Sequence, residues 1–187
     1  MKPKKGIHIL PSLFTTGNVF CGFYSFVAVL NEEYYLAACA IAIGMIFDGL
    51  DGRIARLTKT TSAFGEQYDS LADIITFGMA PAFLVYSWVL KPFGRLGWMA
   101  AFLFLLCAAL RLARFNVSKP EARNQYFLGL PSPAAAVVLA SIVIAFEDLF
   151  ATKMNPFIMV MVVYILAFLM VSNVKYPAFK KFDFKKR

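Results

Sequence analysis

Long apolar runs separated by short polar stretches make up most of the chain. The runs Ile9–Asn31, Phe127–Phe146 and Met154–Val174 contain no charged residue. Each run is about as long as the roughly 20 residues that a helix needs to cross a bilayer. The pattern therefore predicts three membrane-spanning helices that carry no charge.

Three further apolar runs reach this length only when they include charged residues. The expected helices cover residues 34–57, 68–90 and 96–114. Ionisable groups are costly inside a membrane, so their presence in three helices marks a functional site. The expected fold is an all-α integral membrane protein, a single domain over residues 1–187. It is a bundle of six transmembrane helices with a cytoplasm-facing polar cavity.

Composition supports membrane insertion. Hydrophobic residues make up 60% of the chain and charged residues 16%, whereas about a quarter of an ordinary soluble domain is charged. The net charge of +8 does not indicate nucleic-acid binding, because the basic residues are spread among apolar runs. With six spans, 16 of the 19 lysines and arginines lie on the side of both termini. The positive-inside rule then predicts a multi-pass protein of the cell membrane with both termini cytoplasmic.

Cysteine and histidine chemistry is not indicated. Cys21, Cys39 and Cys107 lie in apolar runs and have no metal-ligand spacing, so we interpret them as small buried residues. His8 is the only histidine, which argues against histidine-based catalysis.

Four aspartates gather in one segment of a chain that has only 11 acidic residues. On helices, Asp48 and Asp51 share a face, and so do Asp69 and Asp73. Carboxylates brought close together repel one another unless a cation holds them. All-oxygen ligands suit Mg²⁺, Mn²⁺ or Ca²⁺ better than Zn²⁺. The alternative is a set of helix caps and ion pairs with nearby basic residues (Arg53, Arg56 and Lys59).

The segment also resembles a known signature. The pattern D-x-x-D-G-x-x-A-R, eight residues, then G-x-x-x-D-x-x-x-D is typical of the CDP-alcohol phosphatidyltransferase family. Its fixed positions here are Asp48, Asp51, Gly52, Ala55, Arg56, Gly65, Asp69 and Asp73. Every fixed position matches at the family spacing. The resemblance implies a metal-dependent transferase that binds one or two Mg²⁺ or Mn²⁺ ions at a site that Ca²⁺ can also occupy. It also implies that the protein forms a homodimer.

The resemblance also implies a role for each matching residue. The metal ligands it implies are Asp48, Asp51, Asp69 and Asp73, and Asp73 is in addition the general base that deprotonates the attacking alcohol. The residues implied to contact the CDP portion are Gly52, Arg56 and Ser62. A glycine lets a ligand approach the helix backbone closely, and an arginine offers a fixed fork to a phosphate.

Three further stretches are similar to the phosphatidylserine synthase branch of this family. They are LPSLFTTGNVFCGFYS (residues 10–25), LRLARFN (110–116) and FLGLPSPAAA (127–136). This similarity implies CDP-diacylglycerol and L-serine as substrates, within membrane lipid, and phosphatidylserine and CMP as products.

Arg111, Arg114 and Asn116 are the candidate residues for the acceptor. Arg111 and Arg114 lie at i, i+3 on one expected helix, where a guanidinium fork could bind the serine carboxylate and Asn116 could add a hydrogen bond. The two arginines could equally be anchors at the membrane edge. In the same way, Thr15, Thr16 and Asn18 either face the nucleotide or hydrogen-bond to neighbouring helices.

Two other functions remain open from the sequence. The acceptor could be glycerol 3-phosphate or inositol phosphate, with an anion pocket supplied by Arg111, Arg114, Lys119 and Arg123. The aspartates could instead line the pathway of a divalent-cation transporter. Such a pathway places carboxylates near the bilayer midplane, whereas these lie toward one edge of the expected spans.

Overall fold

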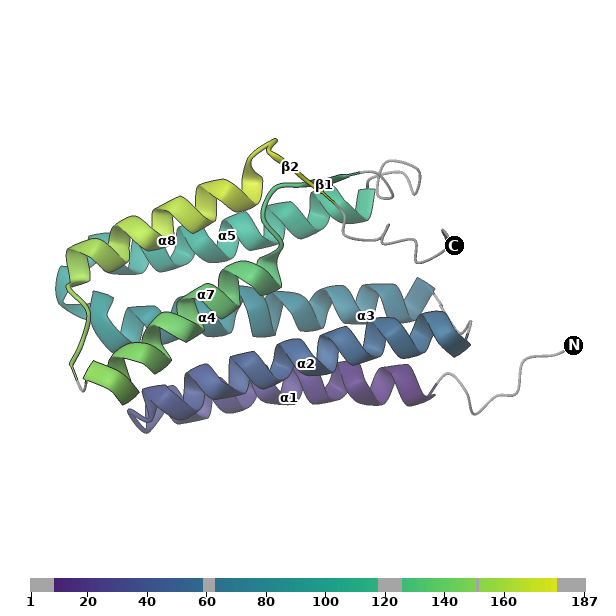
Figure 1. Ribbon diagram of the computed structural model, residues 1–187, viewed down its shortest axis with the longest axis horizontal. Coiled ribbons are helices and arrows are strands. Elements are labelled where there is room, and N and C mark those ends of the chain that lie inside the picture. Colours follow the sequence, from purple (N-terminus) through teal and green to yellow (C-terminus); the bar gives the residue numbers. More distant parts are fainter. Residues whose placement is uncertain (1–8, 59–62, 118–125, 151, 178–187) are drawn as a thin grey trace, which may run out of the picture.

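The computed structural model describes residues 9–58, 63–117, 126–150 and 152–177. They form a bundle of helices that run approximately along one direction (Figure 1). The α-helices are α1 (Ile9–Leu30), α2 (Tyr34–Thr58), α3 (Ala63–Asp73), α4 (Ala80–Val85), α5 (Arg95–Val117), α7 (Ser132–Ala145) and α8 (Pro156–Val171). Short π-helical segments η1 (Ile74–Met79), η2 (Tyr86–Leu90) and η4 (Phe146–Phe150) and the 3₁₀ segment η3 (Lys91–Phe93) continue these helices.

Five helical spans in the described part of the chain are long and apolar enough to cross a membrane. They are Leu13–Leu30, Tyr34–Ile54, Phe64–Phe93, Arg95–Val117 and Ser132–Phe150. The sixth apolar helix, α8, has 16 residues. At 1.5 Å per residue it measures about 24 Å, less than the roughly 30 Å of a bilayer core. The expected all-helical membrane bundle is confirmed.

The fifth expected helix begins later than the sequence predicts. Phe127 lies in strand β1 (Tyr126–Leu128), opposite Tyr176 of strand β2 (Lys175–Pro177). Gly129 then adopts φ +78°, a left-handed conformation, and a Cβ there would lie 2.3 Å from the Met170 carbonyl oxygen. The helix can therefore start only after this turn, and α7 begins at Ser132.

Apolar side chains occupy both the inside and the outside of the bundle. The largest fully buried side chains include Trp88, Phe77, Phe104, Ile41 and Leu139. Equally large side chains such as Leu13, Phe20, Phe102, Phe157 and Phe168 are exposed on the outside. A lipid-facing surface explains this, because a soluble protein rarely exposes such large contiguous apolar patches.

Thr76 packs the third span tightly against the first two. A Cβ on Gly22 of α1 would lie 2.6 Å from Thr76 Oγ1, and a Cβ on Gly44 of α2 would lie 2.7 Å from Thr76 Cγ2. The Thr76 hydroxyl donates to the Asn18 carbonyl oxygen at 2.9 Å. Thr76 belongs to the π-helical turn η1, and Pro81, which has no N–H, follows soon after it. The two glycines thus let η1 touch both helices and fix α3 beside them.

The two ends of the bundle differ in which elements meet there. In Figure 1, α1 begins, α2 ends and α3 begins at one end of the bundle, which we call the site end. The turn between α1 and α2 and the connection between α7 and α8 lie at the opposite end.

Candidate active site and metal centre

Three of the four aspartates come together between α2 and α3, in the half of the bundle nearer the site end. Asp48 is on α2, and Asp69 and Asp73 are on α3. One carboxylate oxygen from each residue lies within 4.8 Å of the others, and all three side chains are half-buried. The two halves of the aspartate signature, 18 or more residues apart in the sequence, therefore form one cluster.

The cluster fits a hard divalent cation. Its donors are all carboxylate oxygens, the type that Mg²⁺, Mn²⁺ and Ca²⁺ prefer. Asp73 Oδ1 is buried and has no hydrogen-bond partner among the described residues. An unpartnered buried carboxylate oxygen beside two further carboxylates is unfavourable unless a cation compensates for it.

Asp51 points toward α1 rather than into this cluster. Its side chain is 6% exposed, and one of its oxygens accepts a hydrogen bond from the Thr15 hydroxyl. The other oxygen, Oδ1, is buried and unpartnered within the described chain. Of the two options for Thr15, the structure thus shows a bond to a neighbouring helix. The role of Asp51 as a fourth metal ligand stays a prediction.

Contacts from α1 hold the two aspartate-bearing helices in place. Besides the bond between Thr15 and Asp51, the Thr16 hydroxyl lies 3.0 Å from the Tyr68 hydroxyl of α3. Asn18 is fully buried, its carbonyl accepts from Thr76, and neither atom of its side-chain amide has a partner in the described residues. Helix α1 therefore supplies the polar surface against which the cluster is assembled.

A polar pocket of about 210 Å³ adjoins the cluster. It lies between α3 and α5 and is lined by Glu66, Gln67, Asp69, Ser70, Asp73, Leu112, Phe115 and Asn116. The Asn116 amide donates to the Ser70 hydroxyl at 3.0 Å. Asn116, expected from the sequence to bind the acceptor, is thus within the same pocket as Asp69 and Asp73. Ser70 was not singled out in the sequence, although it lies between the two aspartates of the signature.

Arg111 is buried behind this pocket. Its side chain is 8% exposed, and its Nη1 donates to the hydroxyl of Ser132, the first residue of α7, at 3.1 Å. The guanidinium carbon lies 5.9 Å from the centre of the Phe115 ring, which lines the pocket. Arg111 Nε has no hydrogen-bond partner in the described part of the chain.

Arg114 makes different contacts from Arg111. Its Nη1 donates to the Val171 carbonyl at 3.1 Å and to Asn173 Oδ1 at 3.2 Å, and its Nη2 donates to the Ser172 carbonyl at 3.2 Å. These groups lie at the C-terminal end of α8, where the last carbonyls of a helix lack partners within the helix. Arg114 therefore caps α8, and it does not line the 210 Å³ pocket.

Residues 8–173 match the sequence pattern of CDP-alcohol phosphatidyltransferases. The chain belongs to the CDP-alcohol phosphatidyltransferase family. It is therefore a membrane transferase, and the three aspartates of the cluster all belong to the family signature.

Several characterised members of the family are similar along most of the chain. The CDP-diacylglycerol–serine O-phosphatidyltransferase of Helicobacter pylori (strain ATCC 700392 / 26695) is 40% identical over 180 residues, which are 96% of this chain and 76% of that protein. The protein of the same name from Bacillus subtilis (strain 168) is 33% identical over 175 residues, which are 94% and 93% of the two chains. That of Methanocaldococcus jannaschii is 39% identical over 153 residues, 81% and 67%.

The remaining family residues are only partly described. Gly52 is exposed on α2, immediately after Asp51. Arg56 lies within α2, but its side chain is outside the described part of the structure. Ser62 lies wholly outside the described residues. The CDP-binding roles of these three residues remain predictions from the family resemblance.

Proposed function

We propose that this transferase is a phosphatidylserine synthase, which moves the phosphatidyl group of CDP-diacylglycerol to the hydroxyl of L-serine and releases CMP. The observation that carries the proposal is the convergence of Asp48, Asp69 and Asp73 beside a pocket that has room for a small acceptor. The three similar proteins described above carry the same activity in their names.

The charge of the pocket favours serine over a phosphorylated acceptor. Its described lining contains Glu66, Asp69 and Asp73 but no lysine or arginine. Glycerol 3-phosphate or inositol phosphate would bring a dianion into this acidic surrounding, whereas serine brings an ammonium group that Glu66 can attract. Of the four basic residues considered for a phosphorylated acceptor, Arg111 and Arg114 do not line this pocket, and Lys119 and Arg123 lie outside the described residues. The described lining therefore favours serine.

Asp48, Asp69 and Asp73 would hold one or two divalent cations, Mg²⁺ or Mn²⁺, with Asp51 as a further ligand. When bound, the cation neutralises the diphosphate charge of the lipid nucleotide and stabilises the leaving phosphate. Gly52, Arg56 and Ser62 would contact the CDP portion. Arg56 would add a guanidinium to a phosphate oxygen, and the absence of a side chain at Gly52 would let the nucleotide approach α2.

Asp73 would act as the general base. Its oxygens border the acceptor pocket, and Oδ1 has no other described partner. Asp73 takes the proton of the serine hydroxyl while the serine oxygen attacks the phosphorus that carries diacylglycerol. The bond from that phosphorus to the CMP oxygen breaks, and CMP leaves with the electron pair. Asn116 and Arg111 would orient serine, with Arg111 Nε available for its carboxylate.

The membrane orientation and assembly are also part of the proposal. The distribution of basic residues favours a site end that faces the cytoplasm. The water-soluble serine and CMP would enter and leave the site from there. The acyl chains of CDP-diacylglycerol would lie between the helices in the lipid. By family resemblance the protein would form a homodimer, which crosslinking in native membranes can test.

The deciding experiment is an acceptor comparison. The purified protein, reconstituted with CDP-diacylglycerol and Mn²⁺, is assayed for CMP release with serine, glycerol 3-phosphate or inositol phosphate. We expect CMP release with serine together with phosphatidylserine formation. Faster CMP release with either phosphorylated acceptor would replace serine in the proposal, and no CMP release with any alcohol would reject the transfer reaction.

A further inference from the structure

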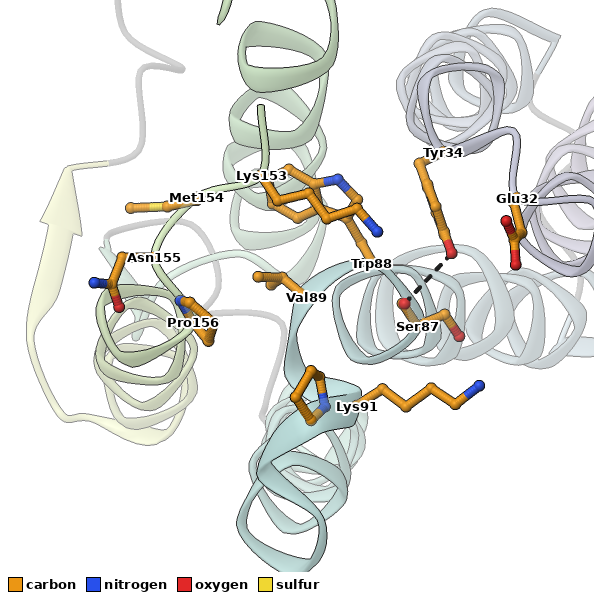
Figure 2. Close-up of a pocket in the computed structure, with 11 residues that line it drawn as sticks. Glu32, Tyr34, Ser87, Trp88, Val89, Lys91, Lys153, Met154, Asn155 and Pro156 are labelled. Carbon is orange, nitrogen blue, oxygen red and sulfur yellow. Dashed lines mark hydrogen bonds between the residues drawn. The ribbon is translucent and has the colours of Figure 1, made fainter. Parts of the chain in front are cut away.

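A second pocket lies at the end of the bundle opposite the aspartates. Its volume is about 560 Å³, within the range of small-molecule sites. Three connections that are distant in the sequence build it, namely the turn between α1 and α2, the end of the third span, and the segment before α8 (Figure 2). Its lining residues are Glu32, Tyr34, Ser87, Trp88, Val89, Lys91, Pro92, Lys153, Met154, Asn155 and Pro156.

Two lysines line this pocket. Lys91 and Lys153 both line it, and neither forms an ion pair among the described residues. Lys153 Nζ lies 5.0 Å from the centre of the Tyr34 ring, and Figure 2 shows it directed toward that ring. Glu32 is the only acidic residue of the lining, so the lining carries a net positive charge.

The carboxylate of Glu147 contacts Trp88, one of the residues that line the pocket. Glu147 of η4 accepts a hydrogen bond of 2.5 Å from the indole nitrogen of Trp88. Because Trp88 is 1% exposed, this bond fixes Glu147 against the wall of the pocket. Glu147 is not among the residues that line the pocket.

The walls are held by contacts between separate elements. The Tyr34 hydroxyl donates to the Ser87 carbonyl at 3.4 Å, which joins α2 to the end of the third span. Glu32 adopts φ +62° in the turn before α2, and its N–H donates to the Val29 carbonyl at 3.0 Å. These contacts hold the backbone at Glu32 in a left-handed turn at the pocket rim.

We propose that this pocket binds a phosphate group, from a phospholipid headgroup of the leaflet opposite the aspartates or from a free phosphate. Two lysines on different connections supply six N–H donors to anionic oxygens. Lysines near the ends of membrane-spanning helices can bury their aliphatic stems and hold the ammonium group at the level of lipid headgroups. The apolar lining residues Val89, Met154 and Pro156 suit the glycerol and first methylene groups of a lipid. The site is separate from the transfer reaction at the other end.

The test uses Trp88 as a reporter of the pocket. The chain has two tryptophans, so Trp98→Phe leaves Trp88 as the only one, and this background is placed in phosphatidylcholine nanodiscs. Brominated phosphatidylglycerol is then compared with brominated phosphatidylcholine as a quencher. We expect half-complete quenching of Trp88 at a mole fraction of brominated phosphatidylglycerol that is several-fold lower than the mole fraction of brominated phosphatidylcholine needed for the same effect. Lys91→Gln combined with Lys153→Gln should raise that fraction by about fivefold per lysine.

Two single substitutions test whether the effect depends on the charges of the pocket lining. Arg95→Gln removes an exposed positive charge at the same end without touching the lining, and it should leave quenching unchanged. Glu32→Gln should strengthen quenching by phosphatidylglycerol, because it removes the only acidic group of the pocket. Thermal unfolding in detergent checks that each variant is folded, and should the double lysine variant be unfolded, Glu32→Gln decides alone.

A phosphate titration distinguishes the two sources. If inorganic phosphate reverses the quenching by brominated phosphatidylglycerol and changes Trp88 emission in plain phosphatidylcholine discs, the ligand is free phosphate. If phosphate has no effect while phosphatidylglycerol is preferred, the ligand is a lipid headgroup. Equal quenching by the two lipids with no response to phosphate would overturn the proposal, as would a preference that the lysine substitutions or Glu32→Gln leave unchanged.

Discussion

The side-chain amide of Asn116 donates a hydrogen bond to the hydroxyl of Ser70 at 3.0 Å. The Ser70 hydroxyl in turn lies 2.9 Å from the Glu66 carbonyl oxygen, to which it donates. These bonds tie the wall of the acceptor pocket on α5 to α3, the helix that carries Asp69 and Asp73. Movement of one wall would therefore change the distance from the acceptor to the proposed base.

Asn116→Ala should weaken acceptor binding. It removes both the bond to Ser70 and a side-chain amide from the pocket, so we expect KM for serine to rise by about tenfold while KM for CDP-diacylglycerol stays nearly constant. Steady-state CMP release with each substrate varied measures this. Val117→Ala is the control, since Val117 is exposed and lies outside the pocket lining. A larger effect on CDP-diacylglycerol would place Asn116 at the nucleotide instead.

Asp73→Asn should abolish most turnover and leave the fold intact. An amide occupies nearly the same volume as a carboxylate but cannot accept the serine proton, and general-base catalysis contributes about 10²- to 10⁴-fold. CMP release under saturating substrates measures kcat, and thermal unfolding in detergent checks the fold. Turnover close to that of the unchanged protein would remove Asp73 from the role of base.

Arg111 and Arg114 should respond differently to the same substitution. Arg111→Gln should raise KM for serine by at least about tenfold with little change in KM for CDP-diacylglycerol, because its guanidinium lies at the acceptor side. Arg114→Gln should instead lower stability by about 1–3 kcal/mol, because it leaves carbonyls at the end of α8 without their donor.

Kinetics and unfolding of both arginine variants make this comparison. Arg114→Lys should recover only part of the stability, since a single ammonium cannot reach carbonyls and Asn173 as a planar fork does. An Arg114→Gln protein with unchanged stability and a raised KM for serine would contradict the assignment and restore the role first expected from the sequence.

The sequence predicts the membrane class, the approximate spans and the aspartate cluster, because each depends on local pattern. Apolar run length identifies a span, and the spacing of Asp69 and Asp73 places both on one face of a helix wherever the helix packs. The same reasoning misplaces the start of α7, because a left-handed Gly129 and a strand pairing with residues 175–177 depend on contacts that are distant in sequence.

The different roles of Arg111 and Arg114 could not be predicted either. At i, i+3 they share a helix face, and the sequence treats them as a pair. Only packing shows that Arg111 reaches Ser132 of α7 while Arg114 reaches the end of α8. Likewise, nothing in the local pattern indicates that Asp51 bonds to Thr15, 36 residues earlier.

The contact between Thr76 and the two glycines should control assembly of the cluster. Gly44→Ala should lower stability by about 1–3 kcal/mol, because the new Cβ would lie 2.7 Å from Thr76 Cγ2 and 3.0 Å from Asn18 Oδ1. Gly49→Ala on the same helix is the control, because nothing lies within 4 Å of a Cβ there. Unfolding midpoints in detergent compare the two variants, and equal midpoints would show that η1 is not held by this contact.

Metal binding should distinguish the role of Asp69 from that of Asp51. Mn²⁺ binding, measured by electron paramagnetic resonance on the detergent-solubilised protein, reports the site without any turnover. Asp69→Asn should weaken Mn²⁺ binding by at least about 100-fold, because the residue contributes one of the three converging oxygens. Asp51→Asn should weaken it by about tenfold or less, because one Asp51 oxygen already accepts the Thr15 hydroxyl.

The same variants give a second readout in thermal stability. A cation bound only to the folded state raises the unfolding midpoint with concentration, so Mn²⁺ should stabilise the unchanged protein and a chelator should reverse the effect. Asp69→Asn should lose this stabilisation, and Asp51→Asn should retain most of it. Equal losses in the two variants would make Asp51 a full ligand and imply that it turns from Thr15 into the cluster when the cation binds.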